Sequence, residues 1–161
     1  MVIITKYRQT KKAGKVYIHS EETSACPICC SGLQVIGSRN RKAIGSDGQW
    51  QIYVIRRLRC TVCGHIHHEL PDLLVPYKRH CAGTIEQVVL GDEPPGILKP
   101  PTIQRIRTWW RIVSPYFRGI TLALEAKFEI YFPEQIKPSE IVRAVVNQHF
   151  WTHTRSVCSP I

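Results

Sequence analysis

The chain has 161 residues, 43% of them hydrophobic, which suffices for one domain or two small ones and excludes disorder by composition. Its 22 lysines and arginines outnumber 12 acidic residues, and the net charge of +10 favours nucleic acid as a partner, then an anionic membrane, or else an inert solubilising surface. We expect a cytoplasmic protein without membrane insertion, because the apolar start ends by Lys6, no apolar run approaches about 18–20 residues, and seven cysteines fit a reducing compartment.

The first half of the chain carries the pattern of a β-structure. β-Branched runs predict short strands over residues 2–5, 16–19 and 33–36. The segment 45–48 (Gly-Ser-Asp-Gly) is typical of a turn. The following run, 50–59, predicts a long strand that is central in its sheet, because apolar residues occur on both of its faces.

The second half predicts helices over 82–90, from Ile103 to Pro115, over 116–128 and from about Pro138. The segment 91–96 is rich in glycine and proline and indicates a loop. We expect Thr102 to cap the second helix and Pro115 to kink or end it. The apolar stripe expected on that helix is Ile103, Ile106, Trp110 and Val113.

Two Cys-x-x-Cys pairs, Cys26–Cys29 and Cys60–Cys63, are typical of a four-cysteine zinc site. The 30 residues from Cys30 to Arg59 exceed the roughly 15–20 of the compact motif, which a long β-hairpin between the pairs would explain. The sequence therefore predicts one structural Zn2+, with no catalytic residue because four thiolates leave no open position. A disulfide pair, a redox motif and free core cysteines are the alternatives.

The other cysteines and the histidines have less specific interpretations. We expect Cys30 to be a free thiol, and Cys81 and Cys158 to be small core residues. Four histidines cluster in the sequence: His65, His67, His68 and His80. We expect them to be surface groups or groups around the metal. The alternatives are a second metal site and a cysteine–histidine pair for nucleophilic catalysis.

Basic residues carry the functional prediction. The nucleic-acid-binding candidates are Arg39, Arg41, Lys42, Arg57, Arg59, Lys78, Arg79, Gln104, Arg105, Arg107 and Arg111. Strand alternation places Arg57 and Arg59 on one face and Arg56 on the other. On the helix, Gln104 and Arg105 are the candidates for contacts with base edges, and ordinary solvated charge is the alternative. Three tryptophans are either stacking platforms for bases or core residues: Trp109, Trp110 and Trp151.

The motifs Cys26-Pro-x-Cys29, Arg57-Leu-Arg-Cys60-x-x-Cys63-Gly64, Leu70-Pro and Pro76-Tyr-Lys-Arg79 resemble the N-terminal zinc-ribbon segment of bacterial insertion-sequence transposases. Residues 102–110 look similar to their helix-turn-helix, and the whole chain resembles a family of small uncharacterised bacterial proteins built from these parts. The resemblance covers about residues 24–112 and implies the DNA-binding front end alone. A transposase catalytic domain needs three carboxylates for two metals, and the only aspartates here are Asp47, Asp72 and Asp92.

We therefore predict an α+β protein with a zinc ribbon of β-hairpins over 1–70, a helical, helix-turn-helix-like region over 71–130, and a C-terminal helical extension over 131–161. The predicted function is non-enzymatic binding of double-stranded DNA in a mobile-element or transposase-related role. The alternatives are a zinc-ribbon adaptor subunit that binds a protein partner in a transposition or transcription complex, and an RNA-binding ribbon.

Overall fold

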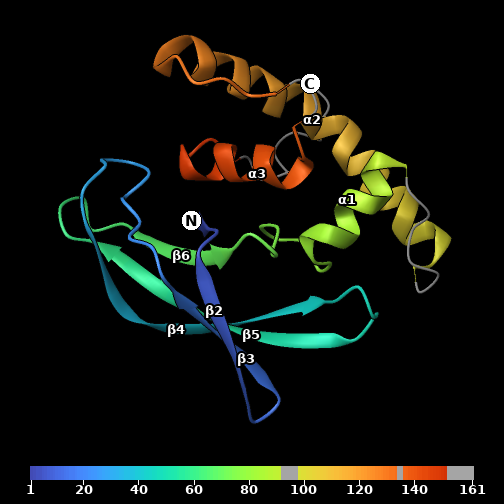
Figure 1. The fold of residues 1–161 in the computed structure, drawn as a ribbon, viewed down its shortest axis with the longest axis horizontal. Coiled ribbons are helices and arrows are strands. Elements are labelled where there is room, and N and C mark those ends of the chain that lie inside the picture. Colours follow the sequence, from blue (N-terminus) through green and yellow to red (C-terminus); the bar gives the residue numbers. More distant parts are fainter. Residues whose placement is uncertain (92–97, 134–135, 152–161) are drawn as a thin grey trace, which may run out of the picture.

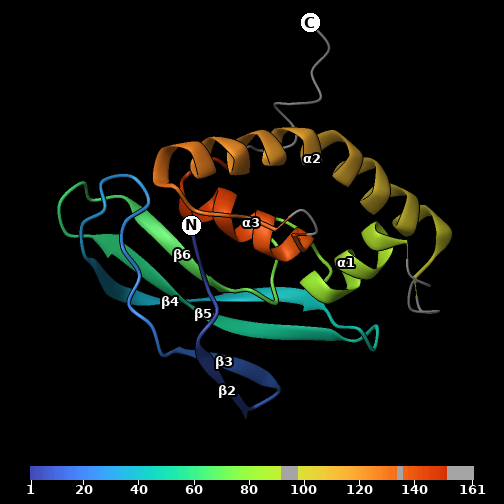
Figure 2. The same ribbon diagram turned by 45° about the horizontal axis from the view of Figure 1, so that its top comes forward.

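The computed structural model describes residues 1–91, 98–133 and 136–151. It confirms an α+β fold, in which six strands form one mixed sheet and three helices lie together on one side of it (Figures 1 and 2). The elements are β1 (Val2–Ile4), β2 (Tyr7–Lys12), β3 (Lys15–Ser20), β4 (Leu33–Ile44), β5 (Trp50–Cys60), β6 (Ile66–Pro71), α1 (Ala82–Leu90), α2 (Pro100–Phe128) and α3 (Pro138–Asn147). In the described part of the chain, no helix is both long and apolar enough to cross a membrane.

Strand β5 is the centre of the sheet, as its apolar faces predicted. On one side it pairs antiparallel with β4 along its whole length. On the other side its first half pairs parallel with β3 and its second half antiparallel with β6. The sheet continues from β6 to β1 in parallel and from β3 to β2 antiparallel.

One polar strand is longer than the sequence predicted, and a second was not predicted at all. The strand expected over 33–36 extends to Ile44, and residues 7–12 form a strand that was not predicted. Both lie at edges of the sheet, where backbone pairing with an apolar neighbour outweighs a low intrinsic β-propensity. The expected turn after β4 is present, and Gly48 donates its N–H to the Gly45 carbonyl oxygen at 3.0 Å.

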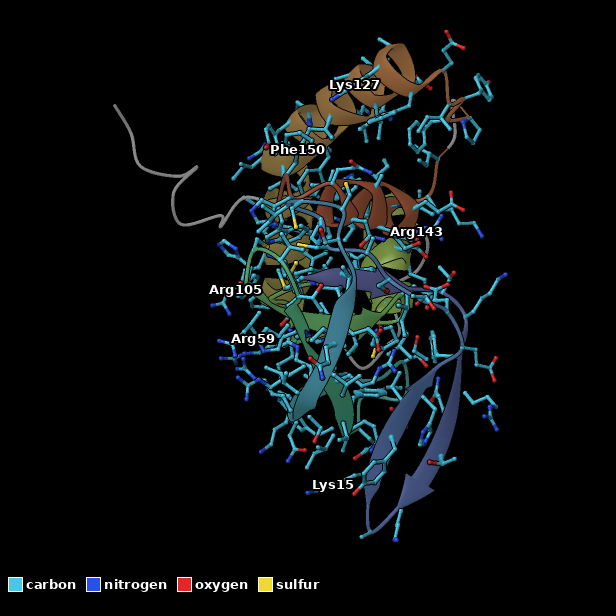
Figure 3. All side chains as sticks on the ribbon, turned by 90° about the vertical axis from the view of Figure 1, so that its left-hand side faces the viewer. Lys15, Arg59, Arg105, Lys127, Arg143 and Phe150 are labelled. Carbon is cyan, nitrogen blue, oxygen red and sulfur yellow. The ribbon has the colours of Figure 1, made fainter. Side chains whose placement is uncertain are left out.

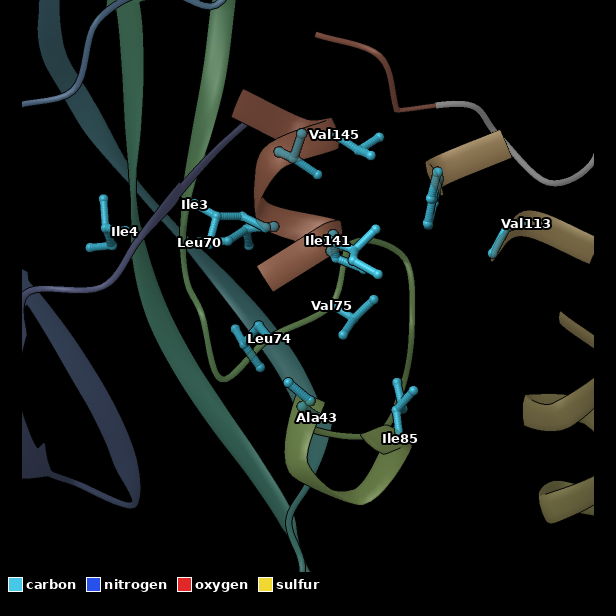
Figure 4. Close-up of a cluster of buried hydrophobic side chains, with 14 of the residues drawn as sticks. Ile3, Ile4, Ala43, Leu70, Leu74, Val75, Ile85, Val113, Ile141 and Val145 are labelled. Atoms are coloured by element: carbon cyan, nitrogen blue, oxygen red, sulfur yellow. The ribbon is translucent and has the colours of Figure 1, made fainter. Parts of the chain in front are cut away.

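The hydrophobic core lies between the sheet and the helices and draws on both ends of the chain. Figure 4 shows Ile3 of β1 and Leu70 of β6 facing Ile141 and Val145 of α3. The side-chain amide of Asn147 adds two hydrogen bonds to this contact. Its Oδ1 accepts from the Ile3 N–H at 2.7 Å, and its Nδ2 donates to the Ile3 carbonyl oxygen at 2.9 Å. The first strand and the last helix are therefore held together directly.

Helix α2 runs through Pro115 without a break, so the prediction of two separate helices that meet at this proline is wrong. The buried stripe continues on both sides of Pro115, with Ile106, Trp109, Val113, Phe117, Ile120 and Leu124. Burial of each large side chain is worth about 1.5–3 kcal/mol, which offsets the roughly 3 kcal/mol cost of proline in a helix. Trp109 occupies the stripe where Trp110 was expected, and the helix begins at Pro100 rather than after Thr102.

The predicted helix-turn-helix is not confirmed. Helix α1 has the predicted bounds and ends at Gly91, whose φ of +87° suits glycine. Nine residues, 91–99, separate α1 from α2, whereas a helix-turn-helix uses about three or four. The predicted loop at 91–96 falls mainly outside the described residues. Helix α3 begins at Pro138 as predicted and buries Ile141 and Val145, whereas His149 lies beyond its end.

Candidate metal centre and nucleic-acid interface

The four predicted metal ligands come together at the open end of the β4–β5 hairpin. The Sγ atoms of Cys26 and Cys63 lie 3.6 Å apart, those of Cys29 and Cys60 lie 3.4 Å apart, and all four lie within 4.8 Å of one another. A tetrahedron with metal–sulfur bonds of about 2.3 Å has sulfur–sulfur distances of about 3.8 Å. The cluster therefore has the composition and the size to hold a metal ion.

Tight backbone turns present these sulfurs. In the first pair, the Cys30 N–H donates to the Cys26 carbonyl oxygen at 2.8 Å. In the second pair, the Cys63 N–H donates to the Cys60 Sγ at 3.4 Å, and Gly64 follows with a left-handed φ of +71°. The register that pairs Leu33 with Cys60 brings the two turns together across the hairpin.

The surroundings shift the thiol pKa values of the cluster in both directions: the pKa of Cys60 is lowered, whereas desolvation and hydrogen bonds with the other cysteines raise that of Cys63 to about 12. Hydrogen bonds from Ser31 lower the pKa of the Cys29 thiol to about 6. The Nε2 of His67 lies 3.4 Å from the Cys26 Sγ, and burial lowers the pKa of His67 to about 4, so its ring is neutral near pH 7. A neutral imidazole with its proton on Nε2 donates a hydrogen bond to that sulfur.

The four histidines do not form a second site. His65 is exposed, His68 Nε2 lies 3.5 Å from Arg39 Nη1, and His80 lies near α1. Within residues 1–91, 98–133 and 136–151, Cys26, Cys29, Cys60 and Cys63 are the only group of three or more potential metal-binding side chains.

The remaining cysteines lie apart from the metal cluster. The Cys30 thiol is exposed, and Cys81 packs against the core with its Sγ 3.8 Å from the Tyr53 hydroxyl. Cys158 lies outside the described residues.

Four of the candidate arginines share one face of the sheet. Arg39 and Arg41 of β4 pair with Ile55 and Tyr53 of β5, so all four side chains are on one face of the sheet. Arg57 and Arg59 are on this face too, because every second residue of a strand points to the same side. We call Arg39, Arg41, Arg57 and Arg59 the basic face. Lys42 pairs with Ile52 and therefore points to the opposite face.

Further basic groups continue from the basic face toward α2. Arg41 is half-buried and donates from Nη2 to the Lys78 carbonyl oxygen at 2.5 Å. Lys78, Arg79 and Arg105 then line one cavity of ≈ 570 Å³. Figure 3 shows Arg59 and Arg105 extending at the same side of the view.

The other candidates on α2 lie elsewhere. At 3.6 residues per turn, Arg107 and Arg111 are about 200° and 240° around the helix axis from Arg105, on the side of Gln104. All three are exposed. The structure thus connects Arg39, Arg41, Arg57, Arg59, Lys78, Arg79 and Arg105, and it leaves Lys42, Gln104, Arg107 and Arg111 apart from them.

The tryptophans on α2 belong mainly to the core. Trp109 is 8% exposed, Trp110 is partly buried, and Trp151 lies against Phe117 with ring centroids 5.4 Å apart. The exposed tryptophan is Trp50, at the start of β5, which sequence reasoning did not select. Thr84, which lines the cavity together with Trp109, was also missed, since no spacing in the sequence signals the proximity of residues on two different helices.

Comparison with known proteins adds one family. No curated protein and no solved structure matches the chain. Residues 26–106 match a family, and this segment begins at the first cysteine of the metal cluster and ends on α2, so that it includes the basic face and most of the cavity. The match covers 81 of the 161 residues, and the chain therefore belongs to the family described as Domain of unknown function (DUF6431).

Proposed function

We propose that this protein binds double-stranded DNA and that one structural Zn2+ stabilises its fold. Zinc is the metal that four cysteine thiolates at this spacing suit best. A four-sulfur site is closed, because no coordination position remains for water or substrate. We therefore assign the metal a structural role, and we assign the protein no catalytic activity.

The observation that carries DNA binding is the basic face. Its four arginines lie on adjacent strands in register, and none has a carboxylate partner among the described residues. Uncompensated guanidinium groups at this density suit phosphate contacts. The net charge of +10 adds long-range attraction to a polyanion.

The mode of binding that these residues support uses the hairpin rather than a recognition helix. Strand β4 lies at an edge of the sheet and pairs with β5 over 11 positions, while β5 pairs on its other side with β3 and β6. Arg39, Arg57 and Arg59 would contact phosphates from this edge of the sheet. The resemblance to the zinc-binding part of insertion-sequence transposases agrees with a mobile-element-related role without a catalytic domain.

The test is fluorescence anisotropy of labelled duplex DNA titrated with the metal-loaded protein at 50 and 200 mM salt. With about 6–10 phosphate contacts, affinity should fall by roughly 10³–10⁵ over this range. A nearly flat salt response would sink the proposal. Competition with single-stranded and double-stranded RNA separates the RNA-binding alternative.

An exposed apolar patch favours an adaptor role as the second candidate. Leu122, Phe128, Ile130 and Tyr131 are between 48% and 81% exposed around the C-terminal end of α2. Apolar side chains gathered at a surface are typical of protein interfaces. Under this alternative, Leu122→Ser with Tyr131→Ser would abolish partner binding and leave DNA binding unchanged.

A further inference from the structure

A cavity of ≈ 570 Å³ lies where the β4–β5 turn, the segment 77–80 and the beginnings of α1 and α2 meet. Figures 1 and 2 show these elements side by side at the end of the sheet remote from the chain's N-terminus. Its volume falls within the roughly 300–1,000 Å³ of small-molecule sites. The cavity is separate from both the metal cluster and the four arginines of the basic face.

Three residues that line this cavity each carry a buried polar atom without a hydrogen-bond partner. In the described part of the chain, the buried side-chain nitrogen and oxygen atoms without a partner are Thr84 Oγ1, Trp109 Nε1 and His80 Nδ1, and all three residues line this cavity. Thr84 is 2% exposed and Trp109 is 8% exposed. Buried polar groups are nearly always paired, and a ligand with donor and acceptor atoms would pair these groups once the side chains turn toward the cavity.

The charge of the cavity selects an anion. Lys78, Arg79, Lys99 and Arg105 line it, and the described lining residues include no aspartate or glutamate. The Nζ of Lys78 lies 3.9 Å above the Trp109 ring. Burial lowers the pKa of Lys78 to about 8, which shows how incompletely water solvates this ammonium group. A bound anion would supply the missing compensation.

Aromatic side chains add a preference for a flat ring. The Trp109 indole forms part of the inner wall, and the Trp50 side chain, also a lining residue, is 58% exposed. Inorganic phosphate alone would not fill a cavity of this volume. A planar heterocycle attached to a phosphate meets every one of these requirements.

We infer that this cavity binds one nucleotide, with its base against Thr84 and Trp109 and its phosphate against Arg105 and Lys99. The nucleotide comes either from the free pool or from a single strand whose base enters the cavity. The inference does not rest on duplex binding by the basic face, since the two surfaces use different side chains.

Isothermal titration calorimetry on the full, metal-loaded chain tests the inference with nucleoside 5′-monophosphates, the matching nucleosides, inorganic phosphate and a single-stranded hexanucleotide. Thr84→Val keeps the side-chain volume and removes the hydroxyl. We expect it to weaken nucleotide and nucleoside about tenfold. Arg105→Gln should weaken the nucleotide by a similar factor and leave the nucleoside unchanged. Arg111→Gln, on another side of α2, is the control and should change neither.

The outcomes separate the two sources. Binding of the monophosphates supports a free nucleotide, and binding of the hexanucleotide alone, with the same sensitivity to Thr84→Val, supports a nucleotide within a strand. Three results overturn the inference: no binding of either probe, binding of inorganic phosphate as tight as that of nucleotides, or an unchanged affinity in Thr84→Val. Thermal denaturation of each variant checks that it is folded. Duplex binding by the same variants is measured in parallel, so that a failure of the nucleotide site is distinguished from a failure of the proposed DNA-binding function.

Discussion

The guanidinium of Arg56 donates two hydrogen bonds to the carboxylate of Glu69, from Nε at 2.6 Å and from Nη2 at 2.7 Å. Glu69 is 1% exposed and the Arg56 side chain is 34% exposed, so this pair ties β5 to β6 at the boundary between the interior and the solvent. The hydrogen bonds raise the pKa of Arg56, which therefore remains charged. Its charge is used within the fold, whereas its neighbours Arg57 and Arg59 face the other side of the sheet.

Arg56→Ala should destabilise the protein strongly. The substitution leaves the buried Glu69 carboxylate without its partner, which costs at most about 3–5 kcal/mol, since water can enter where the partly exposed Arg56 side chain stood. Urea denaturation at pH 7 measures the free energy of unfolding. Arg57→Ala is the matched control, because its side chain has no carboxylate partner among the described residues and should change stability by less than about 0.5 kcal/mol. Similar losses in both variants would contradict the role given to Arg56.

The metal cluster should bind one zinc ion per chain. Elemental analysis of protein purified without a histidine tag should find one equivalent, and Cys29→Ser should lose it because three thiolates bind zinc less tightly than four. Cys30→Ser is the control, since its exposed thiol lies outside the cluster. Chelation should lower the melting temperature of the wild type and of Cys30→Ser alike. Metal-free protein with an unchanged melting temperature would remove the structural role of the ion.

The two faces of the β4–β5 hairpin should differ in their effect on DNA binding. Replacing Arg57 and Arg59 together by alanine removes two phosphate contacts and should lower the slope of log affinity against log salt by about 1.8. Lys42→Ala changes the charge on the opposite face and should leave the slope almost unchanged. Anisotropy titrations at four salt concentrations provide the slopes.

Arg107→Ala with Arg111→Ala distinguishes the hairpin from the helix. These residues are exposed on α2, apart from the basic face. We expect a smaller change in slope than for the hairpin pair. A larger change would transfer the interface to α2 and restore the helix as the DNA-reading element.

Lys78 should make stability depend on pH in the alkaline range. Burial lowers its pKa from 10.5 to about 8 in the folded chain. Between these values the unfolded chain binds more protons than the folded chain, so stability rises with pH from about 8 to 10.5. Below about pH 8 both states carry the Lys78 charge, so the folded chain bears the full cost of the buried ammonium group and this residue no longer makes stability depend on pH.

Lys78→Met removes this titration while keeping a long apolar side chain. The difference in unfolding free energy between wild type and Lys78→Met should therefore favour the variant near pH 7 and shrink as pH rises toward 10.5. Chemical denaturation at several pH values measures it, and Lys42→Met serves as an exposed control. A difference that stays constant with pH would show that burial does not shift the Lys78 pKa.

Some features of the protein follow from local sequence alone. The two Cys-x-x-Cys pairs and the long separation between them predicted a cysteine cluster joined by a hairpin, because ligand spacing and turn chemistry act over a few residues. The apolar run at 50–59 identified the central strand, and the periodicity at 82–90 identified α1. Alternation alone also separated Arg57 from Arg56.

Other features depend on pairing and burial between distant segments. The register of β4 against β5 assigns Arg41 and Lys42 to opposite faces, and no local pattern specifies which face the helices cover. Packing of Phe117, Ile120 and Leu124 carries α2 through Pro115, where propensity predicts a break. The cavity joins Thr84 of α1 to Trp109 of α2 only after both helices dock on the sheet. The cysteine chemistry is therefore readable in the sequence, whereas tertiary contacts decide which cations are neutralised, which lie together and which polar atoms remain unpaired.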